Sequence, residues 1–576
     1  MTTWDIVVLA VYLLIVFSVG LAFTRRAHQN TDQYFLSGRN LPWWVAGTSI
    51  VATSFSCDTP LYVTKLVRTG GVALNWQWWS FAIGSLFSAF FLARLWRRAR
   101  VVTDIELTEL RYGGRAGRTL RTVRAAWFAL LLNTYGMSWV VLAMAKIIGV
   151  VWGGDKMTGV LIASTLAVVY SFFAGFWGVV VTDVAQFIVA IIGAALFAVF
   201  AIDAAGGIES IMATVGRDTM TMLPTIPEAG LFSVDTWTGV FGGFIVYLSV
   251  FWWANQNSDG GGKAIQRMLA TKNEAHAFGA TLWFNIAHFA LRSWPWILVG
   301  LASLVLLPEA PQGDDELTYP ILILTVLPEG LRGLLVAGLV AAFMSTIDTQ
   351  LNWGASYLTH DIYRTRIAPG RTEKHYLWAA KVSMLVLIVL TSLIAYQMQS
   401  VTTAFQFLLA FGAGTGPVYV LRWFWWRVGA WTEISAMIAS TILSTLLYLL
   451  TPDMAYHLKL LIIVGGSMMI FLPVTFLVGS PTLETLMAFY KRTRPPGLWG
   501  PVRQALLEEG YTEIEPGQFR GDLLGWLAGT AMTLGLTFTI GSFALQLWTR
   551  GAVWSAVMFA GGYGVYRWFR LRFPNV

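Results

Sequence analysis

The sequence predicts an all-α integral membrane protein with about 15 transmembrane helices. Three observations predict this class. Of the 576 residues, 56% are hydrophobic and only 12% are charged, about half the charged share of a typical soluble protein. Apolar runs long enough to cross a bilayer as helices recur along the whole chain. The alternating pattern of a membrane β-barrel is absent, so helices must satisfy the backbone polar groups in lipid.

The expected spans follow one another closely. They cover residues 4–23, 42–68, 72–96, 122–150, 157–175, 179–202, 238–258, 275–307, 331–359, 375–398, 402–425, 430–451, 457–478, 522–548 and 551–570. The first run is too long for the core of a signal peptide and lacks a small-residue cleavage pattern, so we expect a retained span. The polar stretch 479–521 is expected to be a cytoplasmic linker with one short amphipathic helix near 502–509.

Basic residues predict the orientation of these spans. The net charge is +8, and the clusters of lysine and arginine lie in alternate loops, including nine arginines within residues 94–124. Residues 308–329 contain acids but no lysine or arginine. By the positive-inside rule the basic loops and the C-terminus are cytoplasmic and the N-terminus is outside. The charge therefore indicates topology rather than nucleic-acid binding.

Two of the spans carry signals that interrupt a membrane helix. The second span places seven hydroxyl or acidic side chains within residues 48–59, directly before Pro60. Proline removes a backbone donor and disfavours helix in the preceding residue, which predicts a break near residues 57–59. The seventh span reads "WWANQNSDGGGKAIQ" from residue 252, and its three glycines favour unwinding. Such breaks, five spans apart, are typical of transporters built from inverted repeats.

The ninth span adds adjacent hydroxyls, Ser345 and Thr346, and an acid, Asp348. Ala342 and Thr346 share a helical face. A small hard cation prefers oxygen ligands, so two hydroxyls together with carbonyls of a broken helix favour a cation site. Taken alone, a Ser-Thr pair can equally bond back to its own preceding turn.

With these features, the chain resembles the sodium:solute symporter family over residues 4–480. The matching motifs are "YFLSGRNLPWW" (34–44), "VTDVAQ" (181–186), "IQRMLATKN" (265–273) and "AAFMSTIDTQLN" (341–352). The resemblance implies a LeuT-type fold with ten core helices in two inverted five-helix repeats. The expected divisions are an extra N-terminal span (1–25), the first repeat (42–203), the inverted second repeat (237–427), two additional spans (428–480), the linker (481–521) and two appended spans (522–576).

The resemblance also implies roles for individual residues. Sodium would be bound by the carbonyls of Ala52, Phe55 and Ala342 and the hydroxyls of Ser345 and Thr346. Asp183 and Asp348 are candidates for an ion pathway, although Asp183 near a helix start also suits an N-cap.

Two basic residues of the eighth span are expected to be structural. Arg292 matches a basic position of the family and is expected to pair with a carbonyl or an acid. His288 is expected to be a hydrogen-bonded packing residue rather than a proton carrier.

A solute cavity is expected between the two breaks. Its candidate residues are Ser56, Asp58, Thr59, Gln77, Asn255, Gln256, Asn257, Asp259, Gly261 and Lys263. Amides suit hydroxyls, carboxylates or ureido groups. Either Lys263 pairs with Asp259, or one of the buried acids binds an amine or a second cation. The chain departs from the family's proline transporters at Ser54, and from its galactose transporters at Lys263.

These observations predict a symporter that couples sodium entry to import of a small polar organic solute in the plasma membrane, the inner membrane of a bacterium. Sodium is the coupling ion, and no cofactor, transition metal, nucleic acid or obligatory protein partner is expected. An enzyme is not expected, since no HExxH or GxSxG motif occurs. Two alternatives remain, a membrane sensor with the same fold and a proton-coupled transporter.

Overall fold

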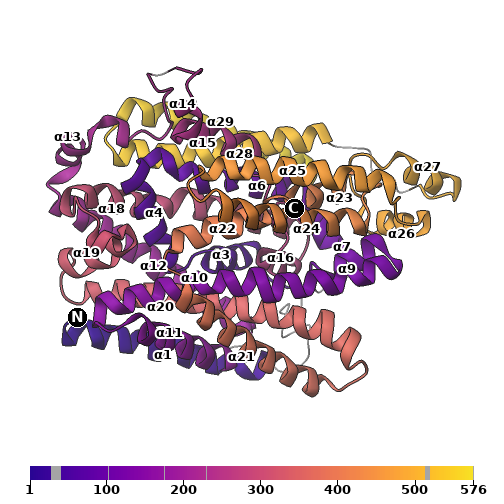
Figure 1. Ribbon diagram of the computed structural model, residues 1–576, viewed down its shortest axis with the longest axis horizontal. Helices are drawn as coiled ribbons and strands as arrows, with labels where there is room; N and C mark the ends of the chain where they lie inside the picture. The colour runs from indigo at the N-terminus through magenta and orange to yellow at the C-terminus, as the bar shows by residue number, and fades with distance from the viewer. Residues whose placement is uncertain (28–39, 102, 174–175, 229, 513–518, 575–576) are drawn as a thin grey trace.

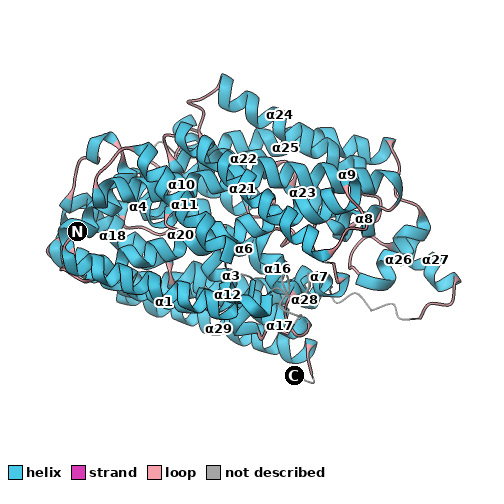
Figure 2. Ribbon diagram, turned by 90° about the horizontal axis from the view of Figure 1, so that it is seen from below, coloured by secondary structure: helices cyan, strands magenta, loops and turns pink. Residues whose placement is uncertain are grey.

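The computed structural model describes residues 1–27, 40–101, 103–173, 176–228, 230–512 and 519–574. These residues form helices joined mostly by short loops, with no β-strand beyond isolated bridges among them (Figure 2). Ten helices of this part of the chain are long and apolar enough to cross a membrane. The predicted all-α membrane class is therefore confirmed, but the count of fifteen spans is not.

The first half of the chain contains α1 and a set of helices up to α14. Their bounds are α1 Thr3–Ala27, α3 Trp43–Thr53, α4 Asp58–Gly70, η2 Val72–Asn75, α5 Trp76–Trp79, α6 Phe81–Phe87, η3 Ser88–Leu92, α7 Ala93–Ala99, α8 Glu106–Tyr112, α9 Gly114–Ala126, η4 Trp127–Asn133, α10 Thr134–Trp152, α11 Lys156–Phe173, α12 Phe176–Ala204, α13 Gly207–Thr219 and α14 Val234–Thr238.

The second half begins with the other interrupted span. Its elements are α15 Val240–Val246, η5 Tyr247–Phe251, α16 Lys263–Leu269, α17 Glu274–Asn285, η6 Ile286–Leu291, α18 Ser293–Leu306, η7 Pro311–Gly313, η8 Asp315–Leu317, α19 Thr318–Val326, α20 Leu331–Ser356, η9 Tyr357–Ile367, α21 Glu373–Gln397, α22 Val401–Ala413, α23 Gly416–Phe424, α24 Ala430–Leu450, α25 Tyr456–Leu477, α26 Leu483–Thr493, α27 Gly500–Glu508, α28 Phe519–Ala544 and α29 Trp548–Arg572.

The first break lies one turn earlier than the sequence predicts. Helix α3 ends at Thr53 and α4 begins at Asp58, so residues 54–57 are unwound rather than 57–59. Pro60 is the third residue of α4. A proline is tolerated in the first turn of a helix because its missing N–H would have no partner there. Pro60 therefore starts the second half-helix instead of forming the break.

The second break is confirmed and is longer than the first. No α-helix covers residues 252–262, between η5 and α16. Gly260 and Gly262 have φ angles of 77° and 78°, a conformation that glycine adopts without strain. Glycines at these two positions therefore allow the chain to turn back into α16.

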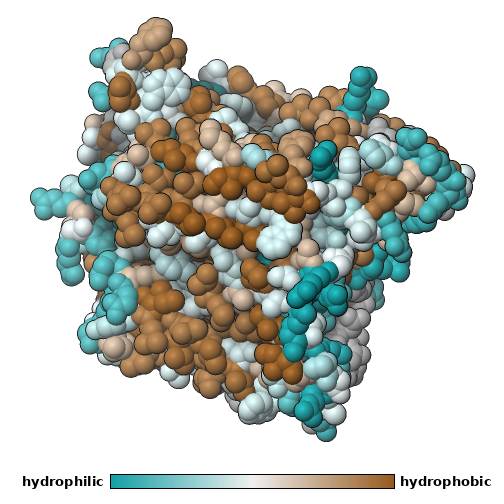
Figure 3. Space-filling model, turned by 45° about the vertical axis from the view of Figure 1, so that its right-hand side comes forward, coloured by the Kyte–Doolittle hydropathy of each residue, from teal (hydrophilic) through white to brown (hydrophobic). Residues whose placement is uncertain are grey.

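The helices run roughly parallel in Figure 1, and the N-terminus lies at the end opposite α26 and α27. Hydrophobic side chains form a broad band on the face shown in Figure 3, with hydrophilic residues at both ends of that band. Helix α20 crosses the centre of the bundle and packs against α12, α3, α10 and α21. Most of its side chains are buried, so it presents the Ser345–Asp348 region to the interior rather than to lipid.

The C-terminal part departs from the simple expectation of a linker and an appended pair of spans. The linker contains two helices, α26 and α27, where only one near residues 502–509 was predicted. Helices α28 and α29 pack along each other, and α28 also packs against η6 and α6 (Figure 1). The Trp294 indole donates to the carbonyl of Thr537 at 2.6 Å. This pair of helices is therefore an integral part of the packed structure.

Candidate functional site

The unwound segment after α3 meets the hydroxyl pair of α20 in the middle of the bundle. The Thr346 hydroxyl donates to the carbonyl of Phe55 at 2.7 Å. Ser345, its neighbour, donates to the carboxylate of Asp183 at 2.5 Å. Ala52 and Ala342 belong to the same two elements and are buried. The fold thus brings the five candidate sodium ligands onto facing segments separated by about 290 positions in the chain.

Asp183 lies inside α12, seven residues after its start at Phe176, so it does not cap the helix. Its carboxylate accepts hydrogen bonds from Ser49 of α3 at 2.6 Å and from Ser345 of α20. A carboxylate that accepts from the Ser345 hydroxyl turns the oxygen lone pairs of Ser345 away from itself. Asp183 therefore joins three helices and orients one of the candidate ligands.

A buried arginine that the sequence analysis did not single out completes this group. Arg267 of α16 donates to Ser49 at 3.3 Å and to Thr349 at 2.9 Å. Its charge interacts with Asp183 and Asp348, both of which are fully buried. Arg267 belongs to the "IQRMLATKN" motif. In the sequence it follows an apolar span, and a basic residue at such a place indicates only the orientation of the span.

Asp348 follows Ser345 by one helical turn and is buried in α20. The Asn352 amide donates to its side-chain oxygen at 3.2 Å. The charge of Arg267 also interacts with it. Asp348 is thus held within a network of protein groups near the cation candidates.

Arg292 and His288 lie next to the start of the first break. The guanidinium of Arg292 donates to the carbonyls of Val51 at 3.0 Å and of Ser54 at 3.4 Å. It also contacts His288 Nδ1. The expected pairing of Arg292 with carbonyls is confirmed, and His288 is hydrogen-bonded as expected.

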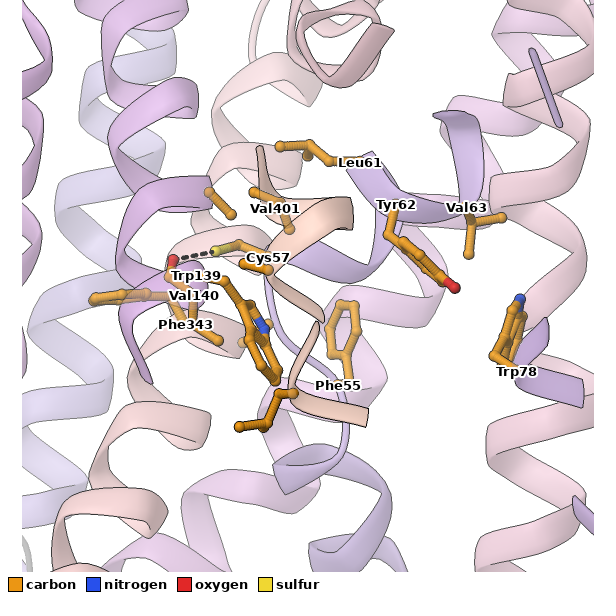
Figure 4. Packing of buried hydrophobic residues seen from close by; sticks show 14 of the residues in the cluster. Phe55, Cys57, Leu61, Tyr62, Val63, Trp78, Trp139, Val140, Phe343 and Val401 are labelled. Atoms are coloured by element: carbon orange, nitrogen blue, oxygen red, sulfur yellow. Dashed lines mark hydrogen bonds between the residues drawn. The ribbon is translucent and has the colours of Figure 1, made fainter. Parts of the chain in front are cut away.

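A cavity of about 330 Å³ lies between the two breaks. From the predicted set, Ser56, Asp58, Thr59, Asn255, Gln256, Asn257 and Gly261 line it. Aromatic rings form much of the remaining wall, with Tyr62, Trp78, Trp139, Trp252, Phe289 and Phe405 among them. Figure 4 shows Phe55, Cys57, Trp139 and Val140 gathered around the unwound stretch, with Tyr62 and Trp78 farther along the wall. Such a mixture of apolar walls and a few polar groups is typical of a small-molecule site.

Three predicted cavity residues are not placed in its wall. Gln77 lies outside the lining and its amide oxygen accepts from the hydroxyl of Tyr62 at 2.6 Å. Asp259 is fully buried. The side chain of Lys263 lies outside the residues that the structure describes, as do residues 34–39 of the first motif.

Asp259 belongs to a buried ion-pair network that the sequence did not reveal. Its carboxylate accepts from Arg422 at 2.5 Å and from the Trp423 indole at 3.1 Å. Arg422 also contacts Glu433 at 3.1 Å, and Arg124 contacts the same acid at 3.3 Å. The open question of the partner of Asp259 is therefore answered by Arg422, 163 residues away. The network fixes the unwound segment to α9, α23 and α24.

Comparison with known proteins identifies the family to which this architecture belongs. The family model of the sodium:solute symporter family matches residues 34–441. The chain is 26% identical over 467 residues to a sodium/glucose cotransporter of Vibrio parahaemolyticus, which covers 76% of this chain and 83% of that protein. Its identity to sodium/glucose cotransporter 4 of Danio rerio is also 26%, covering 74% of this chain and 68% of that protein.

Further matches agree with this placement. A sodium/myo-inositol cotransporter 2 of Rattus norvegicus is 26% identical, over 68% of this chain and 60% of that protein. Among solved structures, a Na⁺-coupled sialic acid symporter superposes with a TM-score of 0.66 at 20% identity, covering 84% of this chain and all of that one. That likeness confirms the predicted LeuT-type fold. On the evidence of the family match over most of its length, the chain belongs to the sodium:solute symporter family and is a sodium-coupled symporter.

Proposed function

We propose that the chain imports an uncharged, hydroxyl-rich solute of sugar or polyol size together with sodium, by alternating access. The solute binds in the cavity between the two breaks. Sodium binds beside it, to the carbonyls of Ala52, Phe55 and Ala342 and the hydroxyls of Ser345 and Thr346. The end of the molecule that carries the N-terminus faces outside, and the basic end faces the cytoplasm.

The contact between Thr346 and the Phe55 carbonyl carries the sodium assignment. It brings the unwound backbone and an α20 hydroxyl within hydrogen-bond distance of each other, which supports a shared ion site. The negative end of the α3 dipole also points into this region. Thr346 lines the solute cavity as well, so ion and solute share a wall. A shared wall supports coupling, because binding of one ligand orders residues that the other contacts.

The cavity's polar groups support the class of solute. Among its described lining residues there is no lysine or arginine, and Asp58 is the only acid. In the described part of the chain, Ser56 Oγ, Gln256 Oε1 and Gln350 Oε1 lack a hydrogen-bond partner. Hydroxyl groups of a solute can donate hydrogen bonds to all three oxygens, whereas an ionised carboxylate has no proton to donate. A carboxylate in this cavity would also meet the acidic side chain of Asp58. Several relatives named above are cotransporters of glucose or myo-inositol.

The experiment is uptake by proteoliposomes with an imposed sodium gradient. A thermal-shift screen of sugars, polyols, amino acids and carboxylates, in sodium and in potassium, first identifies the solute. We expect sodium-dependent uptake of a neutral polyhydroxylated compound, lost in the Ser345→Ala/Thr346→Ala variant. The matched control is Ser444→Ala/Thr445→Ala in α24, where Ser444 bonds within its own helix. Undiminished sodium-dependent uptake by the first variant, or uptake driven by a proton gradient alone, would contradict the proposal.

A further inference from the structure

Arg292 lies against the end of α3, where the first break begins. It is 1% exposed, although a buried charge in a membrane protein is costly unless it serves a purpose. Its guanidinium donates to the carbonyls of Val51 at 3.0 Å and Ser54 at 3.4 Å. These carbonyls alternate along the chain with those of Ala52 and Phe55, the two proposed for sodium. The end of α3 thus offers one pair of oxygens to a fixed cation and a second pair to an exchangeable cation.

The same side chain also fixes the orientation of Phe55. The guanidinium lies 4.6 Å from the centre of the Phe55 ring and 5.2 Å from that of Trp296. The two rings stack on each other with their centres 5.4 Å apart. A guanidinium over an aromatic face is attracted by the ring electrons, and its planar shape suits stacking. Because the ring of Phe55 is held in this way, its carbonyl is held towards Thr346.

Arg292 connects the two half-helices across the break. It bonds to carbonyls at the end of α3, and its charge interacts with Asp58 in the first turn of α4. Between them, only Ser54 and Phe55 donate back to carbonyls of α3, so the backbone of residues 54–57 is held less firmly than a continuous helix. The guanidinium supplies a further constraint through several donors in fixed directions.

We infer that Arg292 is a positioning residue of the sodium site, which holds the unwound segment so that the Ala52 and Phe55 carbonyls face Ser345 and Thr346. This inference rests on the proposed sodium site. A lysine keeps the charge but supplies neither the paired planar donors nor the stacking surface. The shape of the guanidinium, in addition to its charge, therefore sets the affinity for sodium.

The test measures the half-saturating sodium concentration for solute uptake in Arg292→Lys and Arg292→Gln proteins. We expect both values to rise on the order of tenfold, with the solute affinity at saturating sodium nearly unchanged. Discrimination between sodium and lithium should also weaken, an effect that a general loss of stability would not produce. Arg332→Lys is the matched control, because Arg332 bonds to the Leu327 carbonyl at the outer end of α20, away from the break.

A second variant keeps the test decisive if Arg292 variants do not fold. Phe55→Leu removes the ring beneath the guanidinium but leaves the carbonyl, and we expect a rise of about threefold in the half-saturating sodium concentration. A wild-type sodium response in Arg292→Lys, or in Phe55→Leu where the first variant fails to fold, would overturn the inference. If the wild-type protein itself shows no sodium-dependent uptake, the proposed function has failed instead.

Discussion

The carboxylate of Asp183 accepts a hydrogen bond from the hydroxyl of Ser345 at 2.5 Å, in the interior of the bundle. Asp183 comes from α12 and Ser345 from α20, 162 residues later in the chain. The bond directs the free lone pairs of the serine oxygen away from the carboxylate. A residue of α12 thereby orients the side chain of a candidate sodium ligand on α20.

Replacement of Asp183 tests this orienting role. In Asp183→Ala, Ser345 loses its acceptor and Arg267 loses one of its two acidic neighbours, so we expect the half-saturating sodium concentration to rise on the order of tenfold. Asp183→Asn keeps a carbonyl acceptor and should have a smaller effect. Isothermal titration with sodium measures the sodium affinity of both variants. Equal sodium affinity in wild type and Asp183→Ala would contradict the orienting role of Asp183.

Loss of Arg422 should destabilise the protein strongly. In Arg422→Gln, the buried carboxylate of Asp259 loses its charged partner, and breaking a buried pair costs about 3–5 kcal/mol. Thermal unfolding in detergent measures the change. Asp259→Asn combined with Arg422→Gln should recover part of the loss, since no uncompensated carboxylate then remains at that position.

The control for that variant is Arg364→Gln. Arg364 pairs with Glu373 at 3.1 Å, but their side chains are 38% and 49% exposed. An exposed pair contributes only about 0–1 kcal/mol, so its removal should hardly change the unfolding temperature. A similar loss of stability in both variants would show that the buried Asp259–Arg422 pair contributes no more than an exposed pair.

Glu316, between α18 and α19, should make the stability of the protein depend on pH. It lies in η8, accepts from Lys146 at 2.6 Å and Lys65 at 3.2 Å, and accepts from the backbone N–H of Val401 at 2.9 Å. Burial would raise the pKa of Glu316, but Lys146 and Lys65 outweigh it and hold that pKa at about 2. A lowered pKa means that the ionised form stabilises the fold above the unfolded value of 4.5, and that this contribution falls as pH drops from there towards 2.

The measurement compares wild type with Glu316→Gln at pH 7 and at pH 3. At pH 7 the variant should be less stable by about 3 kcal/mol, and the difference should shrink at pH 3. The matched control is Glu309→Gln, because Glu309 belongs to the same loop and is exposed. A gap that stayed constant between the two pH values would rule out the linkage.

Gly416 allows the second break to lie against α23. An added Cβ there would stand 2.3 Å from the Asn255 nitrogen and 2.6 Å from the Trp253 carbonyl oxygen. Gly416→Ala should therefore displace the unwound segment, cost about 1–3 kcal/mol and weaken solute binding. Gly465→Ala in α25 is the matched control, because nothing lies within 4 Å of its added carbon. Unchanged solute affinity in Gly416→Ala would show that this approach does not shape the cavity.

Much of the fold followed from local patterns in the sequence. Apolar runs predicted the positions of the ten helices in the described part of the chain that are long and apolar enough to cross a membrane, since hydrophobic length marks a segment that can span a bilayer. The glycines at 260–262 predicted the second break correctly. Pro60 predicted a break but placed it one turn late, because proline marks the start of a half-helix as readily as the end of one. The helix α26 was missed, since the prolines near it suggested a linker without regular structure.

What the sequence by itself determined is the membrane class, the two interrupted spans and the residue types gathered at them. Hydropathy, glycine and proline act within a few neighbouring residues, so their effects can be predicted from the sequence alone. Only the tertiary structure decided which buried charges meet: Arg422 with Asp259, Arg267 beside Asp183, and Arg292 with the end of α3. Each pairing joins segments far apart in the chain, and a guanidinium can select its partner only after the packing of the helices has brought them together and excluded water.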